Sequence, residues 1–267
     1  MGKYETLFNL NLDIQNIGGK VLSLKRLPFI LREKTSISRN IELFSKKKND
    51  VCYILGLGPS LKEIDLSKLN GDTIATNRFY KYDTSHSIDP TFYLMMDNDF
   101  FLNKEKQCLI DAKRQYPHSA FILNGKYHAE AEGIVGSDSV YYMYSWNGMF
   151  SGKKIDFCKL LPAFGNIVCC AIGFAMGLGY KKITLLGCDF NSFATQKVQH
   201  CYSEDKNAPK LRSLASELFN YSFEAEMHNR LAKYATEQGI QVLNGTPNSL
   251  IDSYPFLTDI EQSEISK

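Results

Sequence analysis

Short apolar runs recur along the chain from Val51 onward, and each is followed by a glycine or a polar residue. An apolar run of this kind, bounded by turn residues, is typical of a buried strand. The runs begin at Val51, Thr73, Thr91, Ala120, Val140, Lys182 and Gly239. The longer segments 167–177 and 213–237 predict helices. Strands that alternate with helices predict an α/β fold that is Rossmann-like, with a mainly parallel sheet and helices on both faces.

Residues 1–50 differ from this pattern, and we interpret them as a basic, partly amphipathic appendage to an α/β domain that covers residues 51–267. The segment 20–34 mixes lysine and arginine with leucine and isoleucine. Basic amphipathic segments bind anionic membrane surfaces, which predicts contact with the inner face of a membrane. The alternatives are an ordinary solvated helix or a packing arm. Pro28 is expected to kink or break any helix in this segment.

The chain has 267 residues, 44% of them hydrophobic, and a net charge of +2. This length supports one large domain, or one domain with a small appendage. The balanced charge does not describe a nucleic-acid binder, so we expect no nucleic-acid partner.

The cysteines have no C-x-x-C spacing, which favours buried free thiols in a reducing compartment. No apolar leader is found near Met1, and the expected location is the cytoplasm.

The polar stretch 191–212 has no clear periodicity and is long for a simple connection. Long loops of this type are often lids over a binding site. We therefore predict a lid that closes on a ligand and excludes water from it.

Small and polar residues follow the predicted strands, at the edge of a parallel sheet where ligands bind. Their amide, carboxylate and hydroxyl groups can hydrogen-bond a nucleotide base, a ribose or sugar hydroxyls. The turn 56–60 can aim backbone amides at a phosphate, although it is neither a P-loop nor a G-x-G-x-x-G motif. Ser60, with Glu63 three residues later, resembles a capping box. The candidate residues are Gly56, Gly58, Ser60, Asn77, Asp97, Gly187, Asp189, Thr246, Asn248 and Ser249.

The triplet Asp97-Asn98-Asp99 is similar to an Asp-x-Asp metal motif. Two carboxylates at a strand end could hold Mg²⁺ or Mn²⁺ beside a diphosphate. We favour the alternative that Asp97 caps the next helix or binds a ribose, and we expect no metal.

His200 and His228 are the two candidate catalytic bases. A base that takes a proton from a hydroxyl group should titrate near neutral pH, which suits histidine. His200 lies in the predicted lid, and its alternative role is a solvated loop residue. His228 lies in the predicted helix 213–237 beside Glu224 and Glu226, and its alternative role is an ion pair on the helix surface.

Four ordered segments of the chain resemble the bacterial sialyltransferases of the glycosyltransferase-42 type. Residues 55–65 resemble the opening strand and turn of that family, and residues 75–80 resemble its second motif. Residues 177–190 are similar to its helix, strand and Gly-x-Asp-Phe motif, and residues 246–250 to its closing Cys-Pro-Asn-Ser. The resemblance extends from about residue 51 to 256. Bacterial keto-deoxy-octulosonate transferases that act on lipopolysaccharide core have a similar layout.

The resemblance implies a variant of the GT-A fold and an inverting transfer from a CMP-sugar. The donor would be an acidic sugar, sialic acid or a Kdo-like sugar, and the acceptor a hydroxyl of a cell-surface glycan or glycolipid. The family needs no metal and no further cofactor, and a histidine acts as its base. We also expect the enzyme to lie peripherally at the inner face of the membrane. A homo-oligomer is one further option.

The resemblance also implies a role for each matching position. Asn77 would bind the nucleotide, and Gly58 and Ser60 would lie near its phosphate or ribose. The remaining positions would line the cytidine and ribose pocket (Gly187, Asp189, Phe190), approach the donor (Gly165, Asn166), or close the base pocket (Thr246, Pro247, Asn248, Ser249).

The chain departs from the family pattern at three places. Leu57 stands where the family has asparagine, and Asn191 stands where it has a phosphate-binding tyrosine, which Tyr202 could replace. The position of the family histidine falls near Ser222, so His200 and His228 both miss it.

Two alternatives to a transferase therefore remain. One is a Mg²⁺-dependent nucleotide pyrophosphokinase-like enzyme with Asp97 and Asp99 on the metal. The other is a binding protein without catalytic activity.

Overall fold

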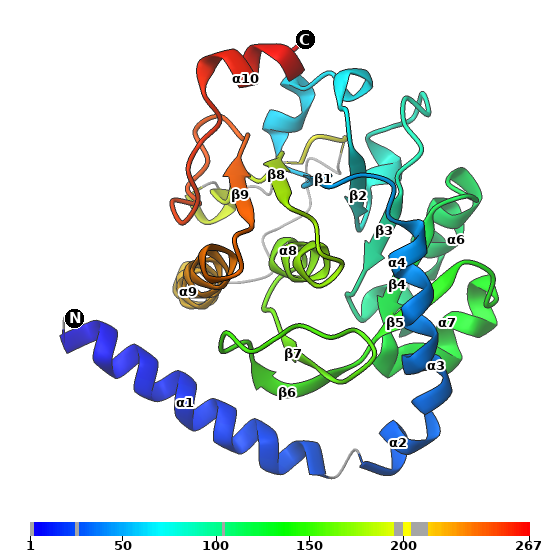
Figure 1. Cartoon of the computed structure of the whole chain (residues 1–267), viewed down its shortest axis with the longest axis vertical. Coiled ribbons are helices and arrows are strands. Elements are labelled where there is room, and N and C mark those ends of the chain that lie inside the picture. Colours follow the sequence, from blue (N-terminus) through cyan, green and yellow to red (C-terminus); the bar gives the residue numbers. More distant parts are fainter. Residues whose placement is uncertain (1–2, 25–26, 103–104, 195–199, 204–212) are drawn as a thin grey trace.

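The computed structural model shows a seven-stranded sheet in which each strand runs parallel to its neighbours (Figure 1). It describes the whole chain except residues 1–2, 25–26, 103–104, 195–199 and 204–212. The strand order is β5-β4-β3-β2-β1-β8-β9. The strands are β1 (Val51–Leu55), β2 (Asp72–Thr76), β3 (Phe92–Met95), β4 (Ala120–Asn124), β5 (Val140–Met143), β8 (Lys182–Leu186) and β9 (Gln241–Asn244). The predicted α/β fold with a mainly parallel sheet is confirmed.

Helices cover both faces of the sheet (Figure 1). Those within the α/β domain are α5 (Asp99–Leu102), α6 (Lys106–Gln115), α7 (His128–Val135), α8 (Ile167–Gly177), α9 (Leu214–Glu237) and α10 (Asp259–Ile265). Short 3₁₀ turns connect them: η2 (Pro59–Glu63), η3 (Leu66–Lys68), η4 (Phe79–Lys81), η5 (Gly125–Tyr127) and η6 (Ser192–Ala194). The predicted helices 167–177 and 213–237 correspond to α8 and to α9, which begins after its cap Ser213.

Successive residues of each strand point to opposite faces and build two separate cores. Ile54 and Ile74 belong to the core beneath α8 and α9. Their neighbours Leu55 and Ala75 belong to the core on the side of α6 and α7. Because both faces are buried, every strand residue can be apolar, which explains the continuous apolar runs in the sequence.

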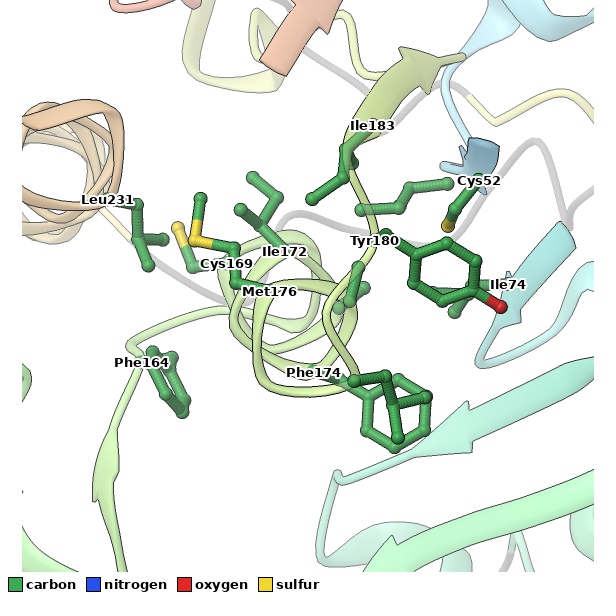
Figure 2. Close-up of a cluster of buried hydrophobic side chains, with 14 of the residues drawn as sticks. Cys52, Ile74, Phe164, Cys169, Ile172, Phe174, Met176, Tyr180, Ile183 and Leu231 are labelled. Carbon is green, nitrogen blue, oxygen red and sulfur yellow. The ribbon is translucent and has the colours of Figure 1, made fainter. Parts of the chain in front are cut away.

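Helix α8 occupies the centre of one core (Figure 2). Its residues Cys169, Ile172, Phe174 and Met176 are buried. Leu231 of α9 lies on the side of Cys169, and Phe174 packs against Phe92 and Phe157. Strand residues from β1, β2 and β8 complete the cluster around the helix. This packing holds the N-terminal end of α8 in a constant position relative to β1 and β8.

The N-terminal segment forms helices outside the main sheet: α1 (Lys3–Leu24), α2 (Leu27–Arg32), α3 (Lys34–Arg39), the turn η1 (Asn40–Glu42) and α4 (Leu43–Lys46). Pro28 lies in the first turn of α2, where a proline is tolerated because that amide has no helical partner. Helix α1 lies along a two-stranded parallel pair, β6 (Ser145–Met149) and β7 (Leu161–Ala163) (Figure 1). The pattern of apolar runs did not predict this pair, since β6 and β7 contain polar residues and proline.

The predicted lid is described only in part. Residues 195–199 and 204–212 lie outside the described residues. Within the remainder, 192–194 form the turn η6, and Cys201 donates its backbone N–H to Leu57 O at 2.8 Å. His200 therefore lies next to a residue that is tied to the turn after β1.

Candidate functional site

The candidate site lies where the order of the strands reverses. From β1 the chain moves to β2 on one side, and β8 later pairs with β1 on the other side. The connections that leave β1 and β8 must diverge at this point, which opens a crevice at the carboxyl ends of the two strands. The turns after β1 and β8 meet there. Gly56 donates its N–H to Leu186 O at 2.7 Å, and Gly58 donates to Gly187 O at 2.8 Å.

Glycine is required at both turns for steric reasons. A Cβ atom on Gly58 would lie 1.8 Å from Asp189 Oδ2 and 2.8 Å from Gly187 O. Gly187 itself has φ +66°, a left-handed conformation that glycine adopts readily. The two turns can approach this closely only because neither glycine has a side chain.

Asp189 is held in place by the turn opposite to it. Ser60 donates its hydroxyl to Asp189 Oδ2 at 2.7 Å, and Leu250 donates its backbone N–H to Asp189 O at 3.0 Å. The predicted capping box at Ser60 is therefore wrong. Gly58 is the residue that precedes the 3₁₀ turn Pro59–Glu63, and Ser60 is a buried residue inside this turn. Its hydroxyl orients a carboxylate of the pocket instead of capping a helix.

Asn77 lines the pocket and has a buried side-chain oxygen without a hydrogen-bond partner. It follows β2 with φ 46°, a left-handed conformation that asparagine tolerates better than most residues. Tyr93 donates its hydroxyl to Asn77 O at 3.0 Å, and Asn77 donates its backbone N–H to Leu94 O at 2.9 Å. The side-chain oxygen Oδ1 is buried and has no hydrogen-bond partner. A buried acceptor of this kind normally has a partner, so a ligand donor is expected here.

The N-terminal end of α8 forms another wall. Asn166 caps the helix, because its Oδ1 accepts the N–H of Cys169 at 2.8 Å. Its Nδ2 donates to Glu224 Oε2 at 3.1 Å, which ties α8 to α9. The next residues, Ile167 and Val168, line the pocket. The partial positive charge of a helix N-terminus at this position favours an anionic group.

Aromatic and hydroxyl groups form the remaining side. The ring centroids of Phe190 and Tyr221 are 4.5 Å apart, and those of Phe193 and Tyr221 are 4.9 Å apart. The hydroxyls of Tyr221 and Ser192 are 2.5 Å apart, and burial raises the pKa of Tyr221. The pocket encloses about 250 Å³. Two hydroxyls and a helix N-terminus could thus surround an anion beside an aromatic wall.

The two candidate histidines lie in different environments. His200 lines the pocket, is half-buried, and has its ring centroid 5.0 Å from that of Tyr202. His228 is only 1% exposed, with Nδ1 at 3.2 Å from Tyr254 Oη and Nε2 at 3.5 Å from Cys169 Sγ. Burial lowers the pKa of His228 to about 4. His228 therefore lacks the near-neutral pKa expected of the base, and it is not the surface ion-pair residue that the sequence offered as its alternative.

Nine of the sixteen predicted site residues line the pocket: Gly56, Gly58, Asn77, Asn166, Gly187, Asp189, Phe190, His200 and His228. Ser60 lies one hydrogen bond behind it, on Asp189. Asp97, Gly165, Tyr202, Thr246, Asn248 and Ser249 do not belong to the lining.

The residues outside the lining have other positions. Asp97, Gly165 and Asn248 are exposed, and Tyr202 is buried in the core on the side of α6 and α7. Thr246 Oγ1 accepts the N–H of Cys188 at 2.9 Å, and Ser249 donates its hydroxyl to Cys188 O at 2.7 Å. The 246–249 turn therefore braces the backbone beside Asp189, and its closing of a base pocket stays a prediction.

Several residues of the lining were not predicted from the sequence, among them Thr76, Ser192, Tyr221, Glu224 and Ile251. Two of them carried a signal. Tyr221, Glu224 and His228 have the spacing of one helical face, so a site that includes His228 predicts Tyr221 and Glu224 on the same side of the helix.

The described residues contain neither a metal-binding cluster nor a helix that could span a membrane. No group of three or more histidine, cysteine, aspartate or glutamate residues in the described ranges is arranged to hold a metal ion. Among the same residues, no helix has the length and apolar character that would let it cross a membrane. All seven cysteines are free thiols.

Comparisons with known proteins found similar solved structures. The sialyltransferase CST-II in complex with a trisaccharide acceptor and CMP has 19% identity and a TM-score of 0.46, covering 78% of this chain and 85% of that one. The sialyltransferase CstII from Campylobacter jejuni in complex with CMP has 18% identity and a TM-score of 0.47, covering 81% and 86%. The monofunctional alpha-2,3-sialyltransferase Cst-I from Campylobacter jejuni has 15% identity and a TM-score of 0.47, covering 79% and 81%. No family model and no curated protein matches the chain.

Proposed function

We propose that this chain is an inverting glycosyltransferase of the sialyltransferase type, which moves an acidic sugar from a CMP-sugar to a hydroxyl of a glycan or glycolipid. The proposal rests on one observation, the unpaired side-chain oxygen of Asn77. The buried Oδ1 of Asn77 lacks a hydrogen-bond partner, and the residue lines the same pocket as Asp189, whose carboxylate accepts the hydroxyl of Ser60. A nucleoside offers the matching donors, namely an exocyclic amino group and the ribose hydroxyls.

The pocket suggests how the donor is held. Asn77 Oδ1 accepts a hydrogen bond from the nucleoside, and Asp189 accepts one from a ribose hydroxyl. The phosphate lies at the N-terminal end of α8, near the hydroxyls of Ser192 and Tyr221. No basic side chain is needed in this arrangement, because the helix N-terminus and the hydroxyls both stabilise negative charge.

The transfer step follows from this placement. The acceptor oxygen attacks the anomeric carbon from the face opposite to the phosphate, and the bond between that carbon and the phosphate oxygen breaks. CMP leaves with the electron pair of the broken bond, and the configuration at the anomeric carbon inverts. His200 takes the proton of the acceptor hydroxyl, since it is the candidate histidine that is half-buried at the pocket and not enclosed in the core.

No specific observation favours the alternatives. A magnesium-dependent pyrophosphokinase would use Asp97 and Asp99, but both residues are exposed and neither lines the pocket. The contact of residues 1–50 with a membrane and the cytoplasmic location stay predictions from the sequence.

CMP is expected to raise the melting temperature of the protein with EDTA present. A ligand that binds only the folded state at a hundredfold excess over its dissociation constant adds about 2.7 kcal/mol to the unfolding free energy. For a chain of this size that corresponds to a shift of roughly 5–10 °C. The measurement is a thermal-shift series with CMP, CDP, UDP, GDP and ATP, each with and without Mg²⁺. A shift that appears only with ATP and Mg²⁺ would exclude the CMP-sugar proposal.

Replacing Asn77 by glycine is expected to weaken CMP binding by about ten- to a hundredfold, which is the loss of one or two buried hydrogen bonds. Glycine is the informative substitution because it tolerates the left-handed backbone at this position, where φ is 46°. The fold should therefore survive while the amide is lost. Isothermal titration with CMP measures the effect.

Asn248→Gly is the matched control for this variant. Asn248 also has a left-handed backbone, with φ 57°, but it is exposed and lies outside the pocket lining. CMP affinity should be unchanged in Asn248→Gly. Equal losses in the two variants would show that the side chain of Asn77 does not contact the nucleotide.

A further inference from the structure

Helix α1 is docked by one narrow face and leaves a row of aliphatic side chains in solvent. Its inner face carries Leu12 and Asn16, which are 2% and 8% exposed, and Asn16 Oδ1 accepts the backbone N–H of Met149 in β6 at 2.6 Å. The opposite side carries Leu10, Ile14, Ile17 and Val21, which are 55%, 61%, 63% and 61% exposed. Figure 1 shows α1 along the outer side of β6 and β7, away from the main sheet.

The spacing of the exposed row indicates what covers it. Leu10, Ile14, Ile17 and Val21 follow one another at intervals of four, three and four residues. Leu7 and Leu24 continue the same intervals in the sequence. Apolar residues at such strict heptad spacing form the narrow seam along which two helices pair, whereas a helix that lies in a membrane surface needs a wider apolar face.

The charges along α1 favour a second copy of the same helix. The sequence of α1 contains two acidic residues, Glu5 and Asp13, and two lysines, Lys3 and Lys20, so it has no net charge to attract an anionic surface. Asp13 is exposed beside the row. When two α1 helices run antiparallel and are centred on the row, position 13 of one copy lies within about one turn of position 20 of the other. Position 13, which is acidic, therefore lies near position 20 of the partner, which is basic. Because the pair is symmetric, the same match occurs in both halves.

We propose that α1 pairs antiparallel with α1 of a second copy of this chain, giving a dimer with two-fold symmetry. The contact is self-complementary, as a two-fold interface requires, because the same aliphatic row and the same charged positions are used by both copies. Gly18 lies beside the row, and a Cβ at this position would meet no atom within 4 Å. The site at the carboxyl ends of β1 and β8 is not part of this surface, so the proposal does not depend on the proposed function.

The unchanged protein is expected to sediment as a dimer at micromolar concentration. Ile14→Glu is expected to sediment as a monomer at the same concentration. Its dissociation constant should rise about tenfold or more, because each copy would bury a charge in the dimer. Ile41→Glu is the matched control. Ile41 is also an isoleucine that is 61% exposed, but it lies in η1 and not in the row. It should remain dimeric. CMP should still raise the melting temperature of Ile14→Glu to the same extent as in the unchanged protein.

A charge exchange tests the antiparallel arrangement. Asp13→Lys should weaken the dimer by a few-fold, and the double variant Asp13→Lys with Lys20→Asp should restore it. A monomeric unchanged protein at all concentrations, or a dimer that Ile14→Glu and Ile41→Glu weaken equally, would overturn the proposal. Flotation of the monomer with vesicles rich in phosphatidylserine, abolished by Ile14→Glu, would assign the row to a membrane surface instead.

Discussion

The variant His200→Asn is expected to lose a factor of about 10²–10⁴ in kcat with a CMP-sugar donor, which is the usual contribution of a positioned general base. CMP should still raise its melting temperature, because the base acts on the acceptor hydroxyl and not on the nucleotide. Asparagine keeps a polar side chain of similar reach but cannot accept a proton at neutral pH. The measurement is kcat in steady state together with the CMP-induced thermal shift.

His228 provides the comparison, because burial lowers its pKa to about 4. Its value in the unfolded chain is about 6.5, so the unfolded state binds the proton more readily than the folded state. The stability that His228 contributes is therefore fully present above pH 6.5 and is lost as the pH falls towards 4. The whole loss is on the order of 3 kcal/mol.

His228→Gln is expected to flatten this dependence without shifting the pH profile of kcat. Denaturant unfolding between pH 4 and pH 7 measures the first effect, and kcat over the same range measures the second. A fall of kcat in His228→Gln as large as that in His200→Asn, with the fold intact, would transfer the role of base to His228.

The variant Gly58→Ala is expected to lose both stability and CMP binding. The backbone at Gly58 has φ −68° and ψ 159°, which alanine adopts without strain, so only the lack of space opposes the change. The added Cβ would lie 1.8 Å from Asp189 Oδ2 and 2.8 Å from Gly187 O. One of these atoms belongs to the backbone, so the turn after β8 has to move. Overpacking of this kind costs about 1–3 kcal/mol of unfolding free energy, and the moved turn carries the carboxylate that faces the pocket.

Two controls separate crowding from a general effect of alanine. A Cβ on Gly133, in α7, would meet no atom within 4 Å, so Gly133→Ala should leave CMP binding unchanged and raise the unfolding free energy by about 0.5–1 kcal/mol. Adding Asp189→Ala to Gly58→Ala removes the nearer obstacle and should recover part of the lost stability. Denaturant unfolding of the four proteins measures these differences, and CMP titration measures binding. Unchanged CMP affinity in Gly58→Ala would show that the two turns do not form the nucleotide site.

The sheet and the core helices could be predicted from the sequence because each follows from a local pattern. The run Val51–Leu55 has to be buried on both faces, and a parallel sheet covered by helices provides that environment. The helix Ile167–Gly177 was predicted with the bounds that the structure shows. The short pair β6 and β7 has no such pattern, and its position depends on α1, which is far away in the sequence.

In the candidate site, too, some features could be predicted from the sequence and others could not. Gly58, Asn77 and Asp189 follow strands directly, so the rule that parallel strands end at one edge was sufficient to bring them together. Ser60 and Thr246 also follow strands, but the sequence did not reveal that their hydroxyls bind Asp189 and the backbone of Cys188. Such side-chain partners depend on the distance between two turns, and that distance is set by the packing of both cores.

The fold class and the edge of the sheet where the site lies could thus be predicted from local sequence patterns. Which side chains reach the pocket depends on how distant segments of the chain pack together. His200 and His228 have the same chemistry in the sequence and both line the pocket, but His228 is buried against Tyr254 and Cys169 while His200 is half-buried. Tyr221 and Glu224 reach the pocket because α9 packs beside α8 with this face turned inward. The pKa of a histidine and its access to a substrate depend on what surrounds it, and those neighbours come from distant parts of the chain.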